Sequence, residues 1–287
     1  MKTKDLQMGT AIESARVQHT ARSPTASFGS IVLIVLVLMA FAAHWITPYD
    51  PLLQDIGARL EPPTAAHLLG TDGLGRDILS RLIYGVRPTL TLVALVAAVM
   101  VPIGLSVGIV AGFHGGWPER ILNGATNVVM AFPRLVLALA FVGLLGPGLL
   151  NAAVALALTG WPAYARLARS ETLLLRRSDY IAAAEMQGIV GLRLLWGHIL
   201  PACIPAMRVR LALDLAAITV AAAALGFLGL GMRPPTPEWG MMIADGSKVV
   251  FDQWWVAAFP GAAIFLTSLA FNSLADRLRD LGDPRHE

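Results

Sequence analysis

The sequence has little of what catalytic and metal sites are usually built from. Its 287 residues contain one cysteine, Cys203, which excludes an intrachain disulfide and a cysteine metal cluster. The only lysines are Lys2, Lys4 and Lys248, and none follows a glycine, so the phosphate-binding loop Gly-x-x-x-x-Gly-Lys-Ser/Thr is missing. The histidines show neither His-Glu-x-x-His nor another ligand spacing. We therefore expect no catalytic residue, no metal and no cofactor in this chain.

Charge is scarce as well. Charged residues make up 14% of the chain and hydrophobic residues 56%, and the mean hydropathy is +0.64, which is typical of a polytopic membrane protein. The net charge of +3 could suggest nucleic acid, but the arginines stand beside apolar runs, as in a membrane orientation signal. We expect membrane lipid, and no nucleic acid, as a partner.

Six apolar runs predict an all-α fold with six transmembrane helices. The first run could be a signal peptide, because small residues at 40 and 42 offer a cleavage site. However, it is longer than a usual signal core and long enough to span a bilayer, so we interpret it as an uncleaved span. The predicted spans are 28–46, 88–112, 121–145, 150–172, 205–231 and 255–275.

An even number of spans puts both termini on one side of the membrane. The basic start, the arginines between 166 and 210, and the basic end all then face the cytoplasm. The predicted segments are a cytoplasmic tail (1–27), a first span with an outer segment (28–87), a transmembrane core (88–278) and a second cytoplasmic tail (279–287).

The segment 179–201 is a polar and small-residue interruption that this orientation places in the cytoplasm. It predicts a thin helix over 180–187 that stops at Gly188, and then a helix with one apolar face that ends at Pro201. Such a pair suits docking into the groove of a partner, and an amphipathic helix lying on the bilayer is the alternative. The second helix has apolar residues at helical spacing, namely Leu192, Leu195, Trp196, Ile199 and Leu200.

Four stretches together resemble ABC importer permeases of the dipeptide, oligopeptide and nickel family. They are LGTDGLGRDILSRLIYGVR (69–87), the run 146–169, the pattern Ala-Ala-Ala, Gly188 and Ile-Leu-Pro in 182–201, and PPTPEWG (234–240). The chain departs from the family pattern at Ala182 and at Ala222, where a glutamate is usual. The resemblance implies the type I ABC importer permease fold, with a cytoplasmic coupling helix. Its implied ATPase-coupling residues are Tyr180, Ala183, Ala184, Gly188, Leu192 and Pro201.

The same resemblance implies partners and a location. The partners are a second homologous permease subunit, one or two ABC ATPase subunits that bind ATP and Mg, and an extracytoplasmic solute-binding protein. The implied location is the bacterial inner membrane. The implied solute is a di- or oligopeptide, with nickel or a metal chelate as the alternative. A secondary transporter and a membrane assembly protein are the other classes that we consider.

Two ionisable residues inside predicted spans are candidates for the translocation pathway. Arg134 follows Pro133, which predicts a kink, and it must either line a cavity or extend to the membrane surface. Asp214 either lines the pathway or pairs with Arg210 one helical turn earlier.

The two outer segments carry further candidates. Asp77 is expected to cap a short surface helix at 78–84, after a tight turn at Gly73 and Gly75. The segment 232–254 predicts an outer lid in which Glu238 supplies a carboxylate and Trp239 suits the membrane interface. A re-entrant loop is the alternative for this segment.

Overall fold

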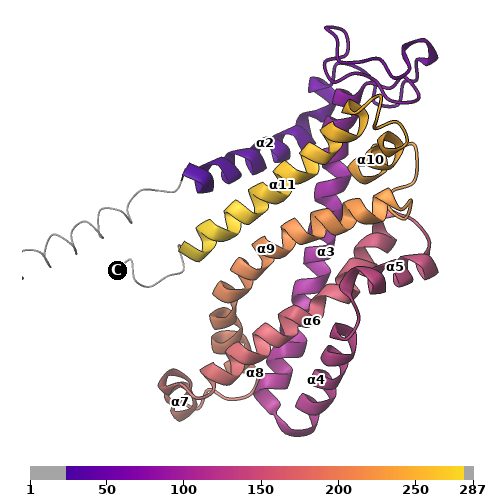
Figure 1. Ribbon diagram of the computed structural model, residues 1–287. Coiled ribbons are helices and arrows are strands. Elements are labelled where there is room, and N and C mark those ends of the chain that lie inside the picture. The colour runs from indigo at the N-terminus through magenta and orange to yellow at the C-terminus, as the bar shows by residue number, and fades with distance from the viewer. Residues whose placement is uncertain (1–23, 281–287) are drawn as a thin grey trace, which may run out of the picture.

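The computed structural model describes residues 24–280, so the predicted tails 1–27 and 279–287 lie almost entirely outside the described residues. Within 24–280 the chain is all-α, as expected, and no strand is present (Figure 1). The long helices are α2 (Pro24–Ile46), α3 (Ile78–His114), α4 (Gly116–Met130), α5 (Arg134–Leu145), α6 (Leu149–Leu175), α9 (Leu200–Phe227) and α11 (Trp255–Asp280). The short elements are the 3₁₀ turn η1 (Ile56–Ala58), α7 (Asp179–Met186), α8 (Leu192–Leu194), the π-helical turn η2 (Leu195–Ile199) and α10 (Trp239–Ser247).

Helices α3 and α6 cross at the centre of the bundle, and glycine lets their backbones meet. A Cβ atom on Gly104, Gly108 or Gly112 of α3 would collide with α6, at Tyr164, Ala165 and Thr172 respectively. In an apolar solvent, close backbone packing of this kind replaces the hydrophobic effect as the force that holds helices together. Gly104, Gly108 and Gly112 stand four residues apart, and this small-residue spacing makes the contact that builds the core.

Helix α2 lies beside α11, so the two ends of the described chain are neighbours (Figure 1). The Arg277 Nη1 atom donates a hydrogen bond of 2.6 Å to Ser30 Oγ, and Gly29 allows α2 to approach Ser273. Within residues 24–280, four helices are long and apolar enough to cross a membrane, namely α2, α3, α8–α9 taken as one, and α11. The bent pair α4 and α5 makes a fifth if it counts as one span.

The predicted count of six spans is therefore not confirmed, because α6 is not among these helices. It is long, but polar residues such as Asn151, Thr159 and Arg166 lower its hydropathy. Much of α6 is buried against other helices, which lets this helix carry polar groups away from lipid. The second predicted span is also longer than expected, because the surface helix predicted at 78–84 is the first part of α3.

The predicted third span, 121–145, is broken. Helices α4 and α5 meet at an angle of 89° across residues 131–133, where the sequence predicted only a kink. Pro133 has φ −57° and ψ 123°, an extended conformation from which α5 starts in a new direction. The residues of the break are exposed on the surface of the chain. A break of this kind leaves backbone groups without helical partners.

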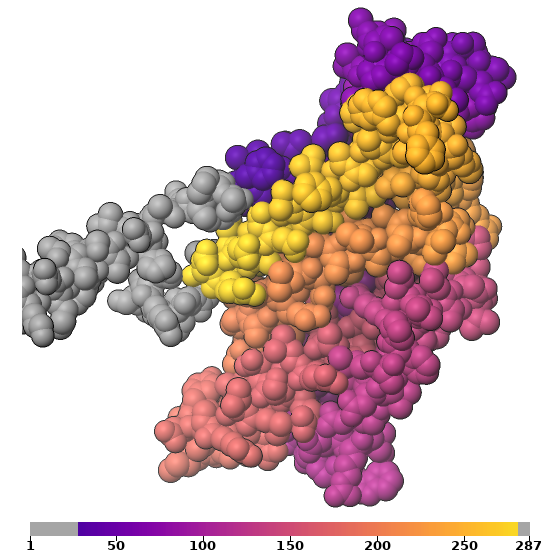
Figure 2. All heavy atoms as spheres, in the orientation of Figure 1, coloured from indigo at the N-terminus to yellow at the C-terminus, as the bar shows by residue number. Residues whose placement is uncertain are grey.

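The outer segment 47–77 is fixed by polar contacts. Asp77 is the N-cap of α3 and accepts a hydrogen bond of 2.7 Å from Ser80 N, as predicted. Asp72 pairs with Arg76 at 2.7 Å and with Arg81 at 3.5 Å. Gly75 turns with φ +72°, and a Cβ there would collide with the backbone of residue 55. These contacts hold the segment as a cap over the start of α3 and the start of α11 (Figures 1 and 2).

The glycine contact between α3 and α6 gives a first prediction. We expect Gly108→Leu to lower the free energy of unfolding by about 1–3 kcal/mol, because the side chain has no room against Ala165 and Ala168. The measurement is the midpoint of thermal unfolding in detergent. Gly124→Leu in α4 is the matched control, since a Cβ there meets nothing within 4 Å. An equal loss in both variants would contradict the packing account.

Candidate functional site

The segment 179–199 protrudes from the end of the bundle opposite the outer segment (Figures 1 and 2). Helix α7 buries Ile181 and Ala184 against the body of the protein and ends at Met186. Gly188 follows with φ +80°, and Ile189 N donates to Ala184 O at 3.1 Å, which closes the helix end. The thin helix and its glycine stop, predicted over 180–187, are therefore present.

Tyr180 and His198 join the two halves of this segment. The Tyr180 hydroxyl lies 2.6 Å from His198 Nδ1, and the two rings lie 5.5 Å apart between centroids. This contact connects the start of α7 to the π-helical turn η2.

The predicted apolar face of 192–200 is divided between two environments. Leu195 and Ile199 are buried in the main core, whereas Leu192 is 72% and Trp196 68% exposed. The prediction of one docking face through all five residues is therefore wrong for Leu195 and Ile199, which anchor the segment instead. We call the remaining exposed apolar side chains the docking patch; its members are Tyr180, Met186, Val190, Leu192 and Trp196.

Pro201 does not end the helix, contrary to the prediction. It stands at the start of α9, and 192–227 runs as one continuous helix. Proline has no N–H to donate to the preceding turn, and that turn is widened: Leu200 N donates to Leu195 O, five residues earlier. The docking patch is thus directly continuous with a helix that is long enough to cross the membrane.

Ala183, Ala184 and Gly188 have different surroundings. Ala184 is buried, Ala183 is exposed, and a Cβ on Gly188 would meet nothing within 4 Å. Space for a partner therefore exists at Ala183 and Gly188 but not at Ala184, which packs against the body of the protein.

Arg134 and Asp214, predicted separately, come together in the structure. Arg134 is the first residue of α5, Asp214 lies halfway along α9, and Nη1 of the arginine is 3.9 Å from Oδ1 of the aspartate. Asp214 also accepts hydrogen bonds from Nε and Nη2 of Arg210, at 2.9 and 3.2 Å. This confirms the predicted pair one turn apart. The charge cluster, as we call Arg134, Arg210 and Asp214, has one more positive than negative group.

The neighbours of the charge cluster come from two more helices. Arg134 Nη2 lies 3.7 Å from Met100 Sδ of α3, and a Cβ on Gly160 of α6 would come within 2.7 Å of that nitrogen. The side chain of Tyr164, buried in α6, faces Asp214. Sequence reasoning missed the roles of Met100 and Gly160, which carry no polar signal. It also missed the pairing itself, although lone intramembrane charges of opposite sign usually pair.

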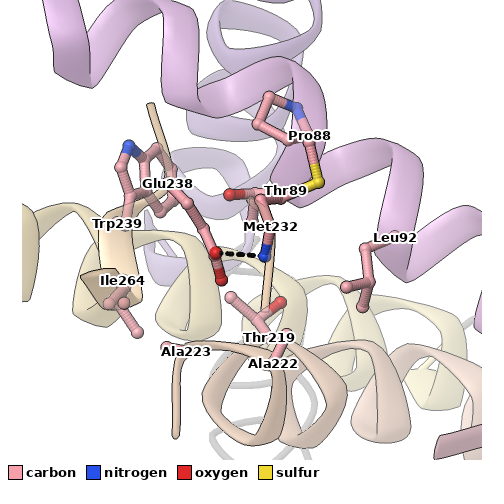
Figure 3. Close-up of a pocket in the computed structure, with 11 residues that line it drawn as sticks. Pro88, Thr89, Leu92, Thr219, Ala222, Ala223, Met232, Glu238, Trp239 and Ile264 are labelled. Atoms are coloured by element: carbon pink, nitrogen blue, oxygen red, sulfur yellow. Dashed lines mark hydrogen bonds between the residues drawn. The ribbon is translucent and has the colours of Figure 1, made fainter. Parts of the chain in front are cut away.

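Both candidate residues of the predicted outer lid (232–254) are buried. The Trp239 side chain is 3% exposed and its Nε1 donates to Leu82 O at 3.1 Å, so this tryptophan is a core residue and not an interfacial one. Glu238 is 7% exposed and accepts a hydrogen bond of 2.7 Å from Met232 N (Figure 3). Its carboxylate lies against Gly226 and Gly231, where a Cβ would collide with it.

Figure 3 shows the Glu238 carboxylate between α3 and α9, beside Thr219 and Ala222. Within residues 24–280, no cation is paired with it. Burial raises the pKa of the Glu238 carboxyl above its ordinary value, and the hydrogen bond from Met232 N opposes this rise in part. The side chain therefore ties the lid to α9 through a buried, titratable group.

Known proteins resemble this chain over most of its length. Residues 104–287 match the family model described as binding-protein-dependent transport system inner membrane component. Residues 18–63 match the N-terminal TM domain of oligopeptide transport permease C.

Two curated relatives are each 40% identical. A probable D,D-dipeptide transport system permease of Escherichia coli aligns over 92% of this chain and 88% of its own. A di/tripeptide transport system permease of Pseudomonas aeruginosa aligns over 93% and 90%.

Solved structures share the fold at low sequence identity. A chain of an amino acid ABC transporter aligns with a TM-score of 0.56 at 18% identity, over 71% of this chain and 94% of its own. A chain of an inward-facing methionine ABC transporter gives 0.52 at 17%, over 69% and 96%. The helical arrangement described above therefore occurs in chains of other ABC transporters.

The buried carboxyl of Glu238 gives a prediction for pH. Its raised pKa means that the folded state binds this proton more tightly than the unfolded chain does. The free energy of unfolding therefore falls as the pH rises from the ordinary carboxyl pKa through the raised one. Glu238→Gln keeps an acceptor for Met232 N and cannot ionise, so its thermal midpoint should fall less between about pH 5 and about pH 8 than that of the wild type.

The control for this prediction is Glu61→Gln, a change of the same chemistry at an exposed glutamate of the outer segment. It should follow the wild-type pH dependence. If Glu238→Gln also follows it, the buried carboxyl does not titrate in this range and the prediction is wrong.

Proposed function

Because the chain belongs to the family of binding-protein-dependent transport system inner membrane components, and is a membrane permease subunit of an ABC importer, we propose that the solute it imports is a di- or oligopeptide. The support is the 40% identity, over nearly the whole chain, to relatives named for dipeptide and di/tripeptide transport. Family membership sets aside the secondary transporter and the assembly protein considered from the sequence. Nickel is retained as the alternative solute.

We further propose that the docking patch receives the ATPase subunits, which would bind ATP and Mg in place of this chain. The patch gathers five large side chains with an exposed fraction of 55% or more at the tip of a rigid segment. Exposed apolar groups of this size are typical of an interface. The residues proposed for ATPase coupling are Tyr180, Ala183, Ala184, Gly188, Leu192 and Pro201, of which Ala184 and Pro201 act by shaping the segment.

The proposed orientation puts the docking patch and both termini in the cytoplasm of a bacterial cell, with the chain in the inner membrane. Two observations support it. Arginines are concentrated at the docking end, at 169, 176, 177 and 193, and at the end of α11. The start of α2 and the end of α11 also lie together, joined by Arg277 and Ser30. The outer segment and the lid then face the solute receptor.

A second permease subunit, homologous to this one, is proposed to cover the break between α4 and α5. Non-helical backbone at membrane depth is tolerated only against protein or a water-filled cavity, and residues 131–133 are exposed in this chain. The neighbouring Arg134 and Asp214 would then line the path between the two subunits. We retain 88–278 as the transmembrane core and 28–87 as the first span with its outer segment.

Solute uptake tests the proposed function. Cells that lack this chain should lose uptake of a radiolabelled dipeptide and regain it when the chain is restored, while nickel uptake should not change. The measurement is initial uptake of both solutes in the same strains. Loss of nickel uptake with unchanged dipeptide uptake would establish the alternative and refute the proposed solute.

Gly188 tests the proposed docking. A residue other than glycine at φ +80° costs about 1–2 kcal/mol, a cost that Gly188→Ala and Gly188→Arg share. Only Gly188→Arg adds a long cation to the docking surface, and we expect it to reduce uptake and recovery of the ATPase with the purified chain at least about tenfold. Gly188→Ala should keep most of both. Equal membrane levels of the two variants are the control, and normal uptake by Gly188→Arg would refute the interface.

A further inference from the structure

We propose that Arg134 and Arg210 bind a carboxylate group of the solute during its passage. When no solute is present, Asp214 is their partner. This inference rests on the proposed function, because it assigns a solute contact within the path of a peptide importer. It concerns the charge cluster at the break between α4 and α5, halfway along α9.

The first observation is an imbalance of charge. Two guanidinium groups share one carboxylate, and Arg210 occupies both of its oxygens, at 2.9 and 3.2 Å. Arg134 is left at 3.9 Å from the nearer oxygen, beyond hydrogen-bond distance. Within the described part of the chain, the cluster therefore has one positive charge in excess, at the start of α5, although such a charge is costly inside a membrane.

The second observation is that Arg134 has spare donors. Within residues 24–280 its guanidinium makes one hydrogen bond, a weak one to the sulfur of Met100, and its Nε is buried with no acceptor. A guanidinium donates two parallel hydrogen bonds to a carboxylate, which is the ligand that fits its geometry best. The cluster offers such a ligand the two Nη atoms of Arg134, whose one hydrogen bond within the described residues is the weak one to sulfur.

The third observation is accessibility. The side chains of Arg134 and Arg210 are 33% and 42% exposed, whereas Asp214 is 8% exposed. Both arginines therefore reach the surface, Arg134 directly after residues 131–133, whereas the aspartate is buried. A solute that enters from this side meets the positive groups first and can replace Asp214 as the partner of one arginine.

The class of ligand follows from this geometry. A dipeptide has a terminal carboxylate that can form the paired hydrogen bonds, while a free divalent cation would be repelled by the net positive charge. Because Asp214 competes with the solute carboxylate for the arginine, the solute is bound reversibly and released onward. A site that bound the carboxylate without such a competitor would hold the solute and slow transport.

The experiment uses the complete complex in liposomes, with its second permease, ATPase subunits and solute receptor. The probes are alanylalanine and its C-terminal amide, and the measurement is the ratio of their transport per ATP hydrolysed. The same receptor delivers both probes, so its own preference cancels when a variant is compared with the wild type. We expect Arg134→Gln and Arg210→Gln to reduce this acid-to-amide ratio about tenfold.

Two variants serve as controls. Arg208→Gln removes an exposed arginine of the same helix outside the cluster and should leave the ratio unchanged. Arg134→Lys keeps the charge and should restore part of the ratio, which a merely structural role of Arg134 would not explain. An unchanged ratio in both glutamine variants overturns the proposal.

A second measurement needs no variant and no transport. In the wild-type complex, phenylglyoxal modifies accessible arginines, and mass spectrometry reports the rate at Arg134 and Arg210. Millimolar alanylalanine should slow modification at these two sites more than its amide does, and neither should change the rate at Arg208. Equal protection by the two probes contradicts the inference. So do arginines at 134 and 210 that stay unmodified when no probe is added. A complex that fails to transport dipeptides but shows selective protection would refute the proposed function alone.

Discussion

A backbone that crosses an apolar medium must satisfy its own hydrogen bonds, and this constraint makes the helix from 192 to 227 the axis of the molecule. It runs without interruption, even through Pro201, because the turn before the proline widens to a π-helical one. The docking patch lies at one end, the charge cluster in the middle and the Glu238 contact near the other end. In the proposed function, a displacement at the patch would reach the charge cluster and the Glu238 contact through this one helix.

The other helices determine which contacts around the helix 192–227 are fixed and which can change. Glycines 104, 108 and 112 join α3 to α6 at backbone distance, so this pair forms a fixed frame. The shorter helices α4 and α5 pack against this frame, and the chain bends between them at 131–133. The charge cluster joins the bent unit to α9 by an ion pair rather than by packed backbones. An ion pair can exchange partners, whereas a glycine contact cannot, and this difference places the adjustable contact beside the proposed path.

Much of the fold follows from the sequence, since long apolar runs and glycine spacing depend on local pattern. Helices α2, α9 and α11, the Asp77 cap and the Gly188 stop are of this kind. The sequence could not separate Leu192 from Leu195, because both have the helical spacing and only packing decides which is buried. The interfacial position predicted for Trp239 is wrong for a similar reason. A tryptophan at a predicted membrane edge suits the interface, but here Leu82 O accepts a hydrogen bond from its indole N–H.

Contacts between distant residues were the harder part. Arg134 and Asp214 each had a plausible local explanation, and only the sharp turn at Pro133 brings them together. A proline predicts a kink but not its angle, which here is 89°. The continuity of α8, η2 and α9 also depended on tertiary support, because Pro201 alone favours a helix end.

The central claim is that the docking patch transmits the action of an ATPase to the helix that carries the charge cluster. The most direct measurement is site-specific photo-crosslinking in the assembled complex, with the crosslinker at Trp196 and, as a control, at Phe251, which is fully exposed between α10 and α11. The account predicts that position 196 captures the ATPase subunit and that position 251 does not. Capture of the solute receptor or of lipid alone at position 196 would contradict it.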